Sequence, residues 1–277
     1  MPLHAEKLMG LKIADRRLNY SDHDTLLYAL SLGAGTGNDP GLVQEEGQRV
    51  IPSFGQNLAF NDSWMNEAGV DLAKVVHGGL ELSFEAPFAP AGEVDVTAGI
   101  VGLSDKGAGK AAVIRHRTEV LRDGRRIFTS TSNLFVRGAG GFGGSVGEQA
   151  PRMARPDGEP DATIETPTRP DQALLFRLLG DRNPLHSQSE VARAAGFDKP
   201  ILHGACTFGM ACLTVLQAYC SGDPARMTGF AARFSGPVYP GETLVFDFWN
   251  VPDGLAFAAS VKERASPVLA DGRATLT

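Results

Sequence analysis

The sequence predicts an α+β protein made of two related halves, each an antiparallel sheet wrapped around a buried helix. Segments of the first half recur in the second, one later segment is apolar on nearly every face of a helix, and alternating strand patterns with tight turns occur in both halves. The 277 residues include 33 Gly and 17 Pro, which allow many turns. The formal net charge of -6, without a long basic run, disfavours nucleic acid as a partner.

The repeat is visible in short matching segments. Three pairs match at offsets of 147, 149 and 150 residues: 24–33 with 171–180, 52–55 with 201–204, and 84–90 with 234–240. Because chance rarely gives three matches at nearly one offset, we interpret the chain as a duplication. We divide it into an N-terminal repeat over 1–137, a Gly- and Pro-rich linker over 138–165, and a C-terminal repeat over 166–277.

Each half is expected to begin with a short helix, followed by an irregular stretch and a longer apolar segment. In the second half Gly180 suits the end of the short helix, and residues 205–219 are apolar on nearly every side, so a helix there must be enclosed. Alternating strands should supply the enclosure, and we expect them at 94–103, 111–121, 127–136, 244–249 and 256–261. A sheet wrapped around one helix is the hot-dog architecture, here present twice.

Two glycine motifs and three cysteines have ordinary explanations. Residues 138–143 fit GxGxxG and residues 143–147 fit GxSxG, but neither motif opens an apolar helix, so a flexible linker is the better interpretation. The cysteines are odd in number and lack CxxC spacing: Cys206, Cys212 and Cys220. We therefore expect core packing, with no disulfide and no metal site.

The segment from Asp181 to His186 carries the candidate chemistry. Its residues are ordinary for a turn, and on its own it slightly favours a structural role. However, the first half has Ala34 in place of Asp181 and no histidine at the place of His186, so these groups are additions to the shared scaffold. Gly204 begins the apolar helix, where unpaired N–H groups and the positive dipole end can bind an oxygen atom. An acid–base pair beside such a site predicts catalysis.

The strings DRNPLH at 181–186, AGFDKPILHG at 195–204 and PVYPGE at 237–242 resemble the MaoC-like hydratase family. Within it, the chain is similar to the R-specific 2-enoyl-CoA hydratases (hydratase 2), which include the hydratase unit of peroxisomal multifunctional enzyme type 2. The resemblance implies a double hot-dog fold and a hydro-lyase of fatty acid β-oxidation. The implied reaction is reversible hydration of trans-2-enoyl-CoA to (3R)-3-hydroxyacyl-CoA.

The resemblance also implies roles for single residues. Asp181, Asn183 and His186 would form the catalytic set, and the backbone N–H of Gly204 would bind the thioester oxygen. Substrate contacts would fall at four further positions: His77, Gly78, Lys106 and Phe234. Which of Asp181 and His186 acts as the base stays open, and so does the preferred acyl chain length.

The expected partner is an acyl-CoA thioester, with coenzyme A as part of the substrate and no other cofactor. The first repeat would then bind the acyl chain without contributing to the chemistry, and Lys106 would hold coenzyme A phosphates. A homodimer is left open. The sequence shows no secretory signal, no apolar run long enough to span a membrane and no C-terminal peroxisomal signal, so we expect a cytoplasmic protein. Alternatives are a hot-dog thioesterase, another acyl-thioester dehydratase, or a non-catalytic acyl-CoA binding module.

Overall fold

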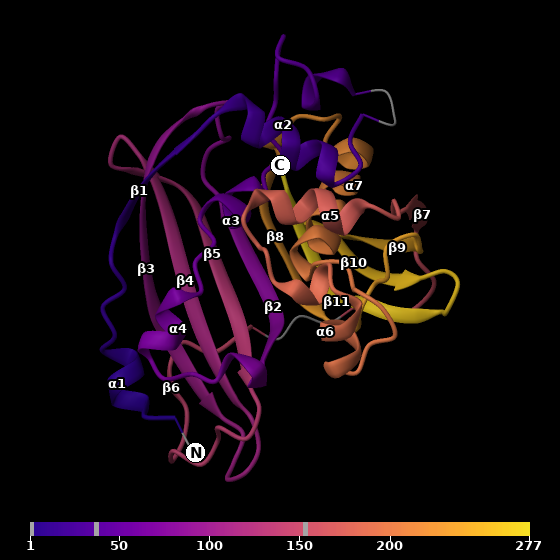
Figure 1. The fold of residues 1–277 in the computed structure, drawn as a ribbon. Helices are drawn as coiled ribbons and strands as arrows, with labels where there is room; N and C mark the ends of the chain where they lie inside the picture. The colour runs from indigo at the N-terminus through magenta and orange to yellow at the C-terminus, as the bar shows by residue number, and fades with distance from the viewer. Residues whose placement is uncertain (1–2, 36–38, 152–154) are drawn as a thin grey trace.

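The computed structural model describes residues 3–35, 39–151 and 155–277 of the chain. Its strands form one curved antiparallel sheet in the order β1-β3-β4-β5-β2-β8-β11-β10-β9-β7, with β6 paired to β3 (Figure 1). The strand bounds are β1 Arg16–Tyr20, β2 Val75–Phe84, β3 Gly92–Asp105, β4 Ala112–Arg122, β5 Arg125–Val136, β6 Val146–Gly147, β7 Ala162–Pro167, β8 Met227–Phe234, β9 Thr243–Val251, β10 Gly254–Val261 and β11 Ser266–Leu276.

The strand order is symmetric about its centre: β1-β3-β4-β5-β2 from one edge corresponds to β7-β9-β10-β11-β8 from the other. β2 and β8 pair at the centre, from Gly79 opposite Arg233 to Ser83 opposite Gly229, and β1 and β7 occupy the two edges. Each strand of one half therefore has a counterpart at the mirrored place in the other half. This order agrees with a duplication and confirms the predicted double hot-dog fold.

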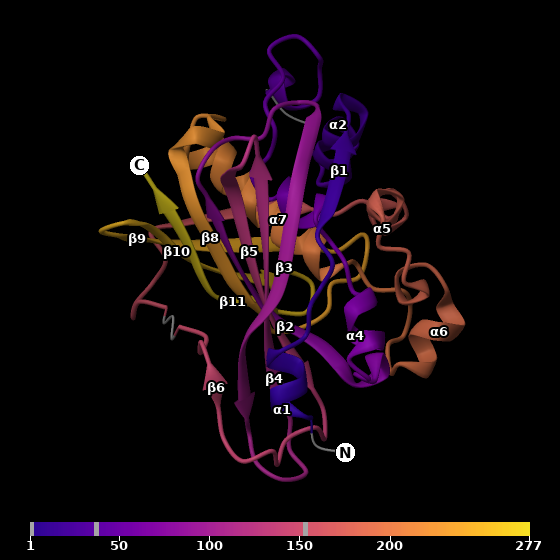
Figure 2. The same cartoon turned by 90° about the vertical axis from the view of Figure 1, so that its left-hand side faces the viewer.

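Short helices and one long helix lie on the inner side of the curved sheet (Figures 1 and 2). The α-helices are α1 Ala5–Met9, α2 Asp22–Ser31, α3 Phe54–Leu58, α4 Ser63–Glu67, α5 Gln172–Phe176, α6 Ser189–Ala194 and α7 Gly204–Tyr219. The single turns are η1 Pro40–Leu42, η2 Leu72–Lys74, η3 Arg177–Leu179, η4 Pro184–His186 and η5 Pro224–Arg226.

Helix α7 is enclosed, as its apolar sequence predicts. Its residues from Cys206 to Leu216 are all buried. Helix α2 of the first half packs closely against it, since a Cβ added at Gly209 would lie 2.8 Å from Leu32 and 2.9 Å from the Tyr28 hydroxyl. The glycine thus allows a close approach between helices of the two halves.

The first half lacks a comparable long helix, which differs from the expected plan of a longer apolar segment in each half. Two five-residue helices, α3 and α4, occupy this region. The break has a local cause: Asn61 Oδ1 accepts hydrogen bonds from the backbone N–H of Ser63 at 3.1 Å and from its hydroxyl at 2.8 Å. Such a local side-chain bond starts a new helix instead of continuing the first.

The expected linker over 138–165 is more structured than its composition suggested. The Asp105 carboxylate accepts hydrogen bonds from the backbone N–H groups of Gly107, Gly141, Gly143 and Gly144, and these bonds lower its pKa to about 2. The GxGxxG string is therefore a backbone cradle for a side chain of the protein itself. At the other end, β7 begins at residue 162 and pairs with β9, so the segment is not a flexible connection throughout. Residues 152–154 lie outside the described residues. The division into two domains stays a prediction.

The three cysteines are buried and free of disulfides, as expected. Burial raises the pKa of the Cys206 and Cys212 thiols, which opposes formation of a reactive thiolate. Within the described residues, no helix combines the length and the apolar character needed to cross a membrane.

Candidate active site

The loop between α5 and α7 brings the candidate residues to the start of α7. Gly180 ends the short helical segment with φ 127°, a conformation that favours glycine, and Asp181 follows directly. The single turn η4 then carries His186 toward the chain that enters α7. Asp181 and His186 are thus brought together by the short loop and the η4 turn that connect them, and not by the pairing of strands.

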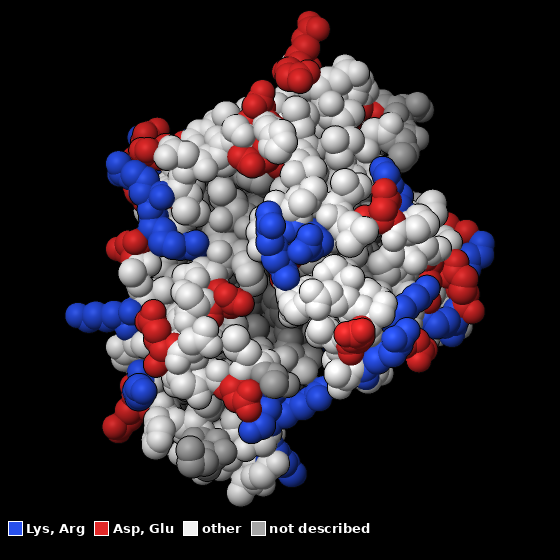
Figure 3. Space-filling view, in the orientation of Figure 1, with Lys and Arg blue, Asp and Glu red and all other residues white. Residues whose placement is uncertain are grey.

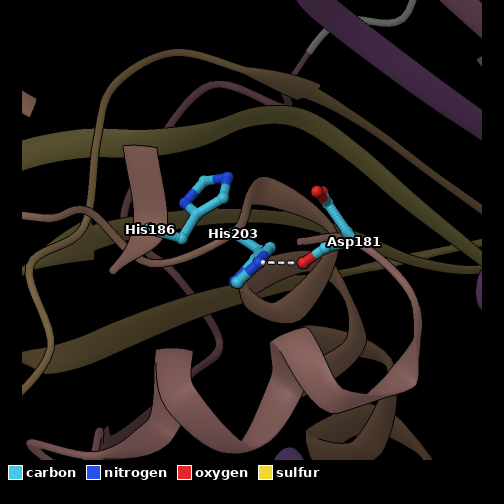
Figure 4. A group of neighbouring side chains, drawn as sticks. All are labelled: Asp181, His186 and His203. Carbon is cyan, nitrogen blue, oxygen red and sulfur yellow. Dashed lines mark hydrogen bonds between the residues drawn. The ribbon is translucent and has the colours of Figure 1, made fainter. Parts of the chain in front are cut away.

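Asp181, His186 and His203 form one compact group (Figure 4). One nitrogen or carboxylate oxygen from each of the three lies within 4.8 Å of the others. The His186 and His203 rings stack, with centroids 3.7 Å apart and planes 25° apart. His203 Nε2 also lies 3.2 Å from the backbone oxygen of Asp181. The predicted neighbourhood of Asp181 and His186 is therefore present in the structure.

The partners of the two rings determine which nitrogen carries the proton in each neutral form. His186 Nδ1 lies 2.9 Å from the Ile201 carbonyl oxygen, which can only accept, so Nδ1 donates and Nε2 keeps its lone pair. By the same reasoning His203 donates from Nε2 to the Asp181 carbonyl, and no described residue offers a hydrogen-bond partner to its Nδ1.

Burial keeps both rings neutral near pH 7. Desolvation lowers the pKa of His186, against the opposing effects of the Ile201 bond and the Asp181 carboxylate. Desolvation, together with the neighbouring His186 ring, lowers the pKa of His203 to about 4. His186 Nε2 can therefore accept a proton from a bound molecule.

Asn183 is part of the loop that holds this group. Its backbone N–H donates to Asp181 Oδ1 at 3.1 Å, and its own Oδ1 accepts from the Leu185 N–H at 3.0 Å. The amide oxygen of Asn183 thus caps the η4 turn, and within the described residues its NH₂ group has no recorded hydrogen bond. Its predicted role at the water stays a prediction.

Gly204 is the first residue of α7 and is exposed. Among the described residues no hydrogen bond is recorded for its N–H group, which agrees with its place in the first helical turn. The group is available to a substrate oxygen at the positive end of a 16-residue helix.

One predicted substrate contact, Phe234, lies beside Gly204, and a second, His77, packs on Phe234. A Cβ added at Gly204 would lie 3.2 Å from Phe234 Cε1, so the Phe234 ring rests against this glycine. The His77 ring packs on Phe234, with centroids 4.8 Å apart. Gly78 lies in a bulge of β2, where a Cβ would clash with the Phe135 ring at 2.2 Å. Packing against Phe135 therefore requires glycine at position 78, whatever its contact with substrate.

Lys106 lies elsewhere, in the turn between β3 and β4. It is exposed, and its backbone N–H bonds to the Ala111 carbonyl oxygen at 3.1 Å. Within the described ranges, no recorded contact joins Lys106 to the Asp181 group. The face of the molecule in Figure 3 is hollowed between the two halves, and both basic and acidic side chains border the hollow.

His203 is the functional candidate that sequence reasoning missed. The signal was present in the repeat, because the corresponding residue of the first half is the apolar Phe54. In the sequence alone, His203 is only the residue that precedes Gly204. The group Asp181, His186 and His203 has the donor types of a metal site. His203 Nε2 and His186 Nδ1 each bond to a carbonyl oxygen. The lone pairs available to an ion would therefore be those of His203 Nδ1 and His186 Nε2.

Comparison with known proteins gives a consistent result across the whole chain. Residues 152–270 match the model of the MaoC like domain, and residues 18–138 match that of the MFE-2 hydratase 2 N-terminal domain. Enoyl-CoA hydratase ChsH3 of Mycobacterium tuberculosis is 38% identical over 94% of this chain and 93% of its own length. The peroxisomal enoyl-CoA hydratase 2 of Arabidopsis thaliana is 32% identical over 96% and 94%. A MaoC-like dehydratase from Phytophthora capsici superposes with a TM-score of 0.90, at 28% identity over 99% of both chains.

Proposed function

The chain belongs to the MaoC-like enoyl-CoA hydratases, a family of hydro-lyases, and on this premise we propose that it converts trans-2-enoyl-CoA to (3R)-3-hydroxyacyl-CoA. The observation that carries the proposal is the group of Asp181, His186 and His203, whose last member directly precedes Gly204 at the start of α7. Hydration needs a base for water, a proton for Cα and a donor for the thioester oxygen.

The proposed reaction begins with a water molecule held between Asp181 and His186. His186 Nε2 takes one proton while the water oxygen bonds to Cβ, and negative charge moves to the thioester oxygen. The Gly204 N–H donates to that oxygen. The Asp181 carboxylate stabilises the imidazolium, and the pair returns the proton to Cα, which restores the starting protonation states.

His203 is proposed as a positioning residue. Its Nε2–H holds the backbone of Asp181, and its ring stacks on His186, so it links both members of the acid–base pair. Its exposed fraction is 1%, which leaves no room for direct contact with bulk water. A small displacement of either group would lower the rate because proton transfer depends on sub-ångström geometry.

Several remaining expectations are proposals of the same kind. We propose that coenzyme A binds only as part of the substrate and that the first half holds the acyl chain, with Lys106 toward the phosphates. We also propose that no metal takes part and that the enzyme is cytoplasmic. Turnover that persists in EDTA would support the metal-free proposal, and loss of turnover restored by a divalent ion would contradict it.

The direct test is chiral analysis of the product formed from crotonyl-CoA and from a long-chain trans-2-enoyl-CoA. We expect the R-3-hydroxyacyl-CoA from both, without release of free thiol. An S product would contradict the stereochemical proposal. Free coenzyme A without a hydroxy product would indicate a thioesterase instead.

A further inference from the structure

A pocket lies at the end of the first-half sheet, where α1 meets the chain that leaves β5. It measures about 230 Å³, and residues of α1, of the loop after α4 and of the loop after β5 line it. Asp181, His186 and Gly204 do not line it. Helices α1 and α7 also lie well apart in both views (Figures 1 and 2). The pocket is therefore distinct from the candidate active site.

Basic side chains gather at this pocket. Lys7, Lys74 and Arg137 line it, and all three are exposed. Asp71 is the one acidic residue among the described residues that line it, and its carboxylate pairs with Lys74 at 3.1 Å. Three cations and one carboxylate leave a net charge of +2, in a chain whose net charge is -6. The pocket therefore attracts anions, and a dianion would balance its charge.

Two of these cations are available to a ligand. Within the described residues, no ion pair and no side-chain hydrogen bond is recorded for Lys7 or Arg137. The backbone N–H of Arg137 donates to the Lys74 carbonyl oxygen at 3.0 Å, which holds these two residues side by side. The exposed N–H of Gly138 likewise has no hydrogen bond recorded among the described residues. Several donors thus surround one pocket without a protein acceptor for each.

Apolar side chains form the inner wall of the same pocket. Leu8, Val70 and Val136 line it, with exposed fractions of 3%, 5% and 3%. They belong to the apolar cluster that packs the end of the first-half sheet. The volume of about 230 Å³ exceeds the roughly 150 Å³ of a protein cavity that holds benzene. An inorganic ion alone would leave most of this space unfilled, so the pocket suits an anion that carries an organic group.

We propose that this pocket is a binding site for an organic phosphate. The phosphate lies among Lys7, Lys74 and Arg137, and its organic group covers the apolar side chains of the inner wall. A dianionic phosphate matches the net charge of +2 better than a single carboxylate does, and the Arg137 guanidinium can donate to two phosphate oxygens at once. Two sources have this chemistry: the coenzyme A part of the proposed substrate and a separate phosphorylated metabolite.

Isothermal titration calorimetry of the full chain with ADP and with inorganic phosphate tests the site. We expect ADP to bind more tightly than inorganic phosphate, because only ADP also covers the apolar wall. Arg137→Gln and Lys7→Gln should each lower the ADP affinity about tenfold, since each removes a charge-assisted hydrogen bond. Both residues are exposed, so circular dichroism should show an intact fold in both variants.

Arg125→Gln is the matched control, because Arg125 is an exposed arginine at the opposite end of β5 and does not line the pocket. It should leave the ADP affinity unchanged. Hydrogen exchange locates the bound ligand: ADP should slow exchange at residues 136–139 of the wild-type protein and not in Arg137→Gln. Absence of binding by both probes, or an ADP affinity that neither Arg137→Gln nor Lys7→Gln changes, would overturn the inference.

Steady-state kinetics with crotonyl-CoA and with crotonyl-pantetheine, which lacks phosphate, separate the two sources. If coenzyme A supplies the phosphate, Arg137→Gln raises KM several-fold for crotonyl-CoA alone, and ADP competes with this substrate. If a separate metabolite supplies it, Arg137→Gln leaves both KM values unchanged, and ADP binds without competing. Either result supports the site and assigns its source. Because ADP binding requires no turnover, failure of the site and failure of the hydratase proposal are distinguishable.

Discussion

Gly55 in the first half and Gly204 in the second occupy the same place in the repeat, at the start of the central helix. Gly55 is buried, and a Cβ added there would lie 2.7 Å from Phe88 and 2.9 Å from Phe128. Gly204 is exposed, and only the Phe234 ring approaches it closely. Aromatic packing thus seals one helix start, and the other stays open to a ligand.

The residues around the two glycines differ in polarity: they are apolar in the first half and polar in the second. Ala34 stands where the second half has Asp181, and Phe54 stands where it has His203. Both first-half residues are part of the apolar core, with exposed fractions of 5% and 1%. The comparison teaches that the shared scaffold needs only small and apolar groups at these places. Polar groups there in the second half need a separate explanation, and the proposed catalysis would supply it.

The central helices differ in length as well, with five residues in α3 and 16 in α7. A long helix offers a positive end and unpaired N–H groups, which suit a developing oxyanion. Residues of α3 and α4 instead line a cavity of about 60 Å³. In the proposed reaction, the long helix of the second half would supply the oxyanion donor, and the first half has no such helix.

The largest expected effect comes from removing the polar groups that distinguish the second half. Asp181→Asn or His186→Ala should lower kcat with crotonyl-CoA by about 10³-fold, because proton transfer to and from water is lost. Circular dichroism should show an intact fold. Asp39→Asn alters a first-half residue 147 positions before His186 that pairs with Arg49, and it should leave turnover unchanged. Near-normal turnover in both site variants would break the comparison.

The proposed oxyanion role of the Gly204 N–H can be tested by a substitution that removes this donor. Gly204→Pro deletes the N–H at the first helical position, where proline is tolerated, and His203 already has φ -59° and ψ 134°, which suit a residue before proline. We expect kcat to fall about 10²- to 10³-fold with little loss of stability. Gly204→Ala keeps the N–H, so steady-state kinetics should show a much smaller effect. Equal losses in the two variants would exclude the oxyanion role.

His203→Phe converts the second-half residue to its first-half counterpart. The ring packing on Phe176 and His186 is retained, but the hydrogen bond to the Asp181 carbonyl is lost. We expect kcat to fall about tenfold or more, with a shifted pH profile and little change in KM. Stability should be kept or improved, because the unpaired Nδ1 disappears. A purely structural role predicts lower stability with an unchanged pH profile.

The pH dependence of stability should draw on both halves. Burial lowers the pKa of His77 and His116 in the first half and of His186 and His203 in the second. The unfolded chain therefore binds protons first as pH falls below about 6.5, and stability present above that pH is lost toward pH 4. Each histidine can contribute up to about 1.4 kcal/mol per pH unit to the slope.

Denaturant unfolding at several pH values measures this slope. His116→Phe in the first half and His203→Phe in the second should each lower the number of protons taken up on unfolding by one, and the slope should fall accordingly. A slope that neither variant changes would show that the two rings are not buried as neutral groups.

The smallest effect is expected at the Asp105 cradle, which the two halves do not share. Asp105→Asn keeps the size of the side chain but weakens its bonds to the N–H groups of Gly141 and Gly143. Hydrogen exchange at these glycines should become faster, with no change in turnover. A loss of activity would indicate that this loop has a role in substrate binding.

Much of the fold follows from local patterns in the sequence. The strands β3, β4, β5, β9 and β10 lie where alternation and turn signals predicted them. The central strands β2 and β8 were not predicted. Neither strand has a regular alternation of buried and exposed residues, so the pattern that revealed the other strands is missing. The edge strands β1 and β7 are short and polar, and their pairing partners alone define them.

The site divides in the same way. The sequence by itself determined the duplication, the lack of counterparts of Asp181 and His186 in the first half, and the glycine before an apolar helix. Each of these follows from comparing residue types at corresponding positions of the two repeats. Only the tertiary structure decided that His203 stacks on His186 and that the Phe234 ring packs between Gly204 and His77 of the first half. These are contacts between distant segments. Sheet curvature and packing create them, and no local preference encodes them.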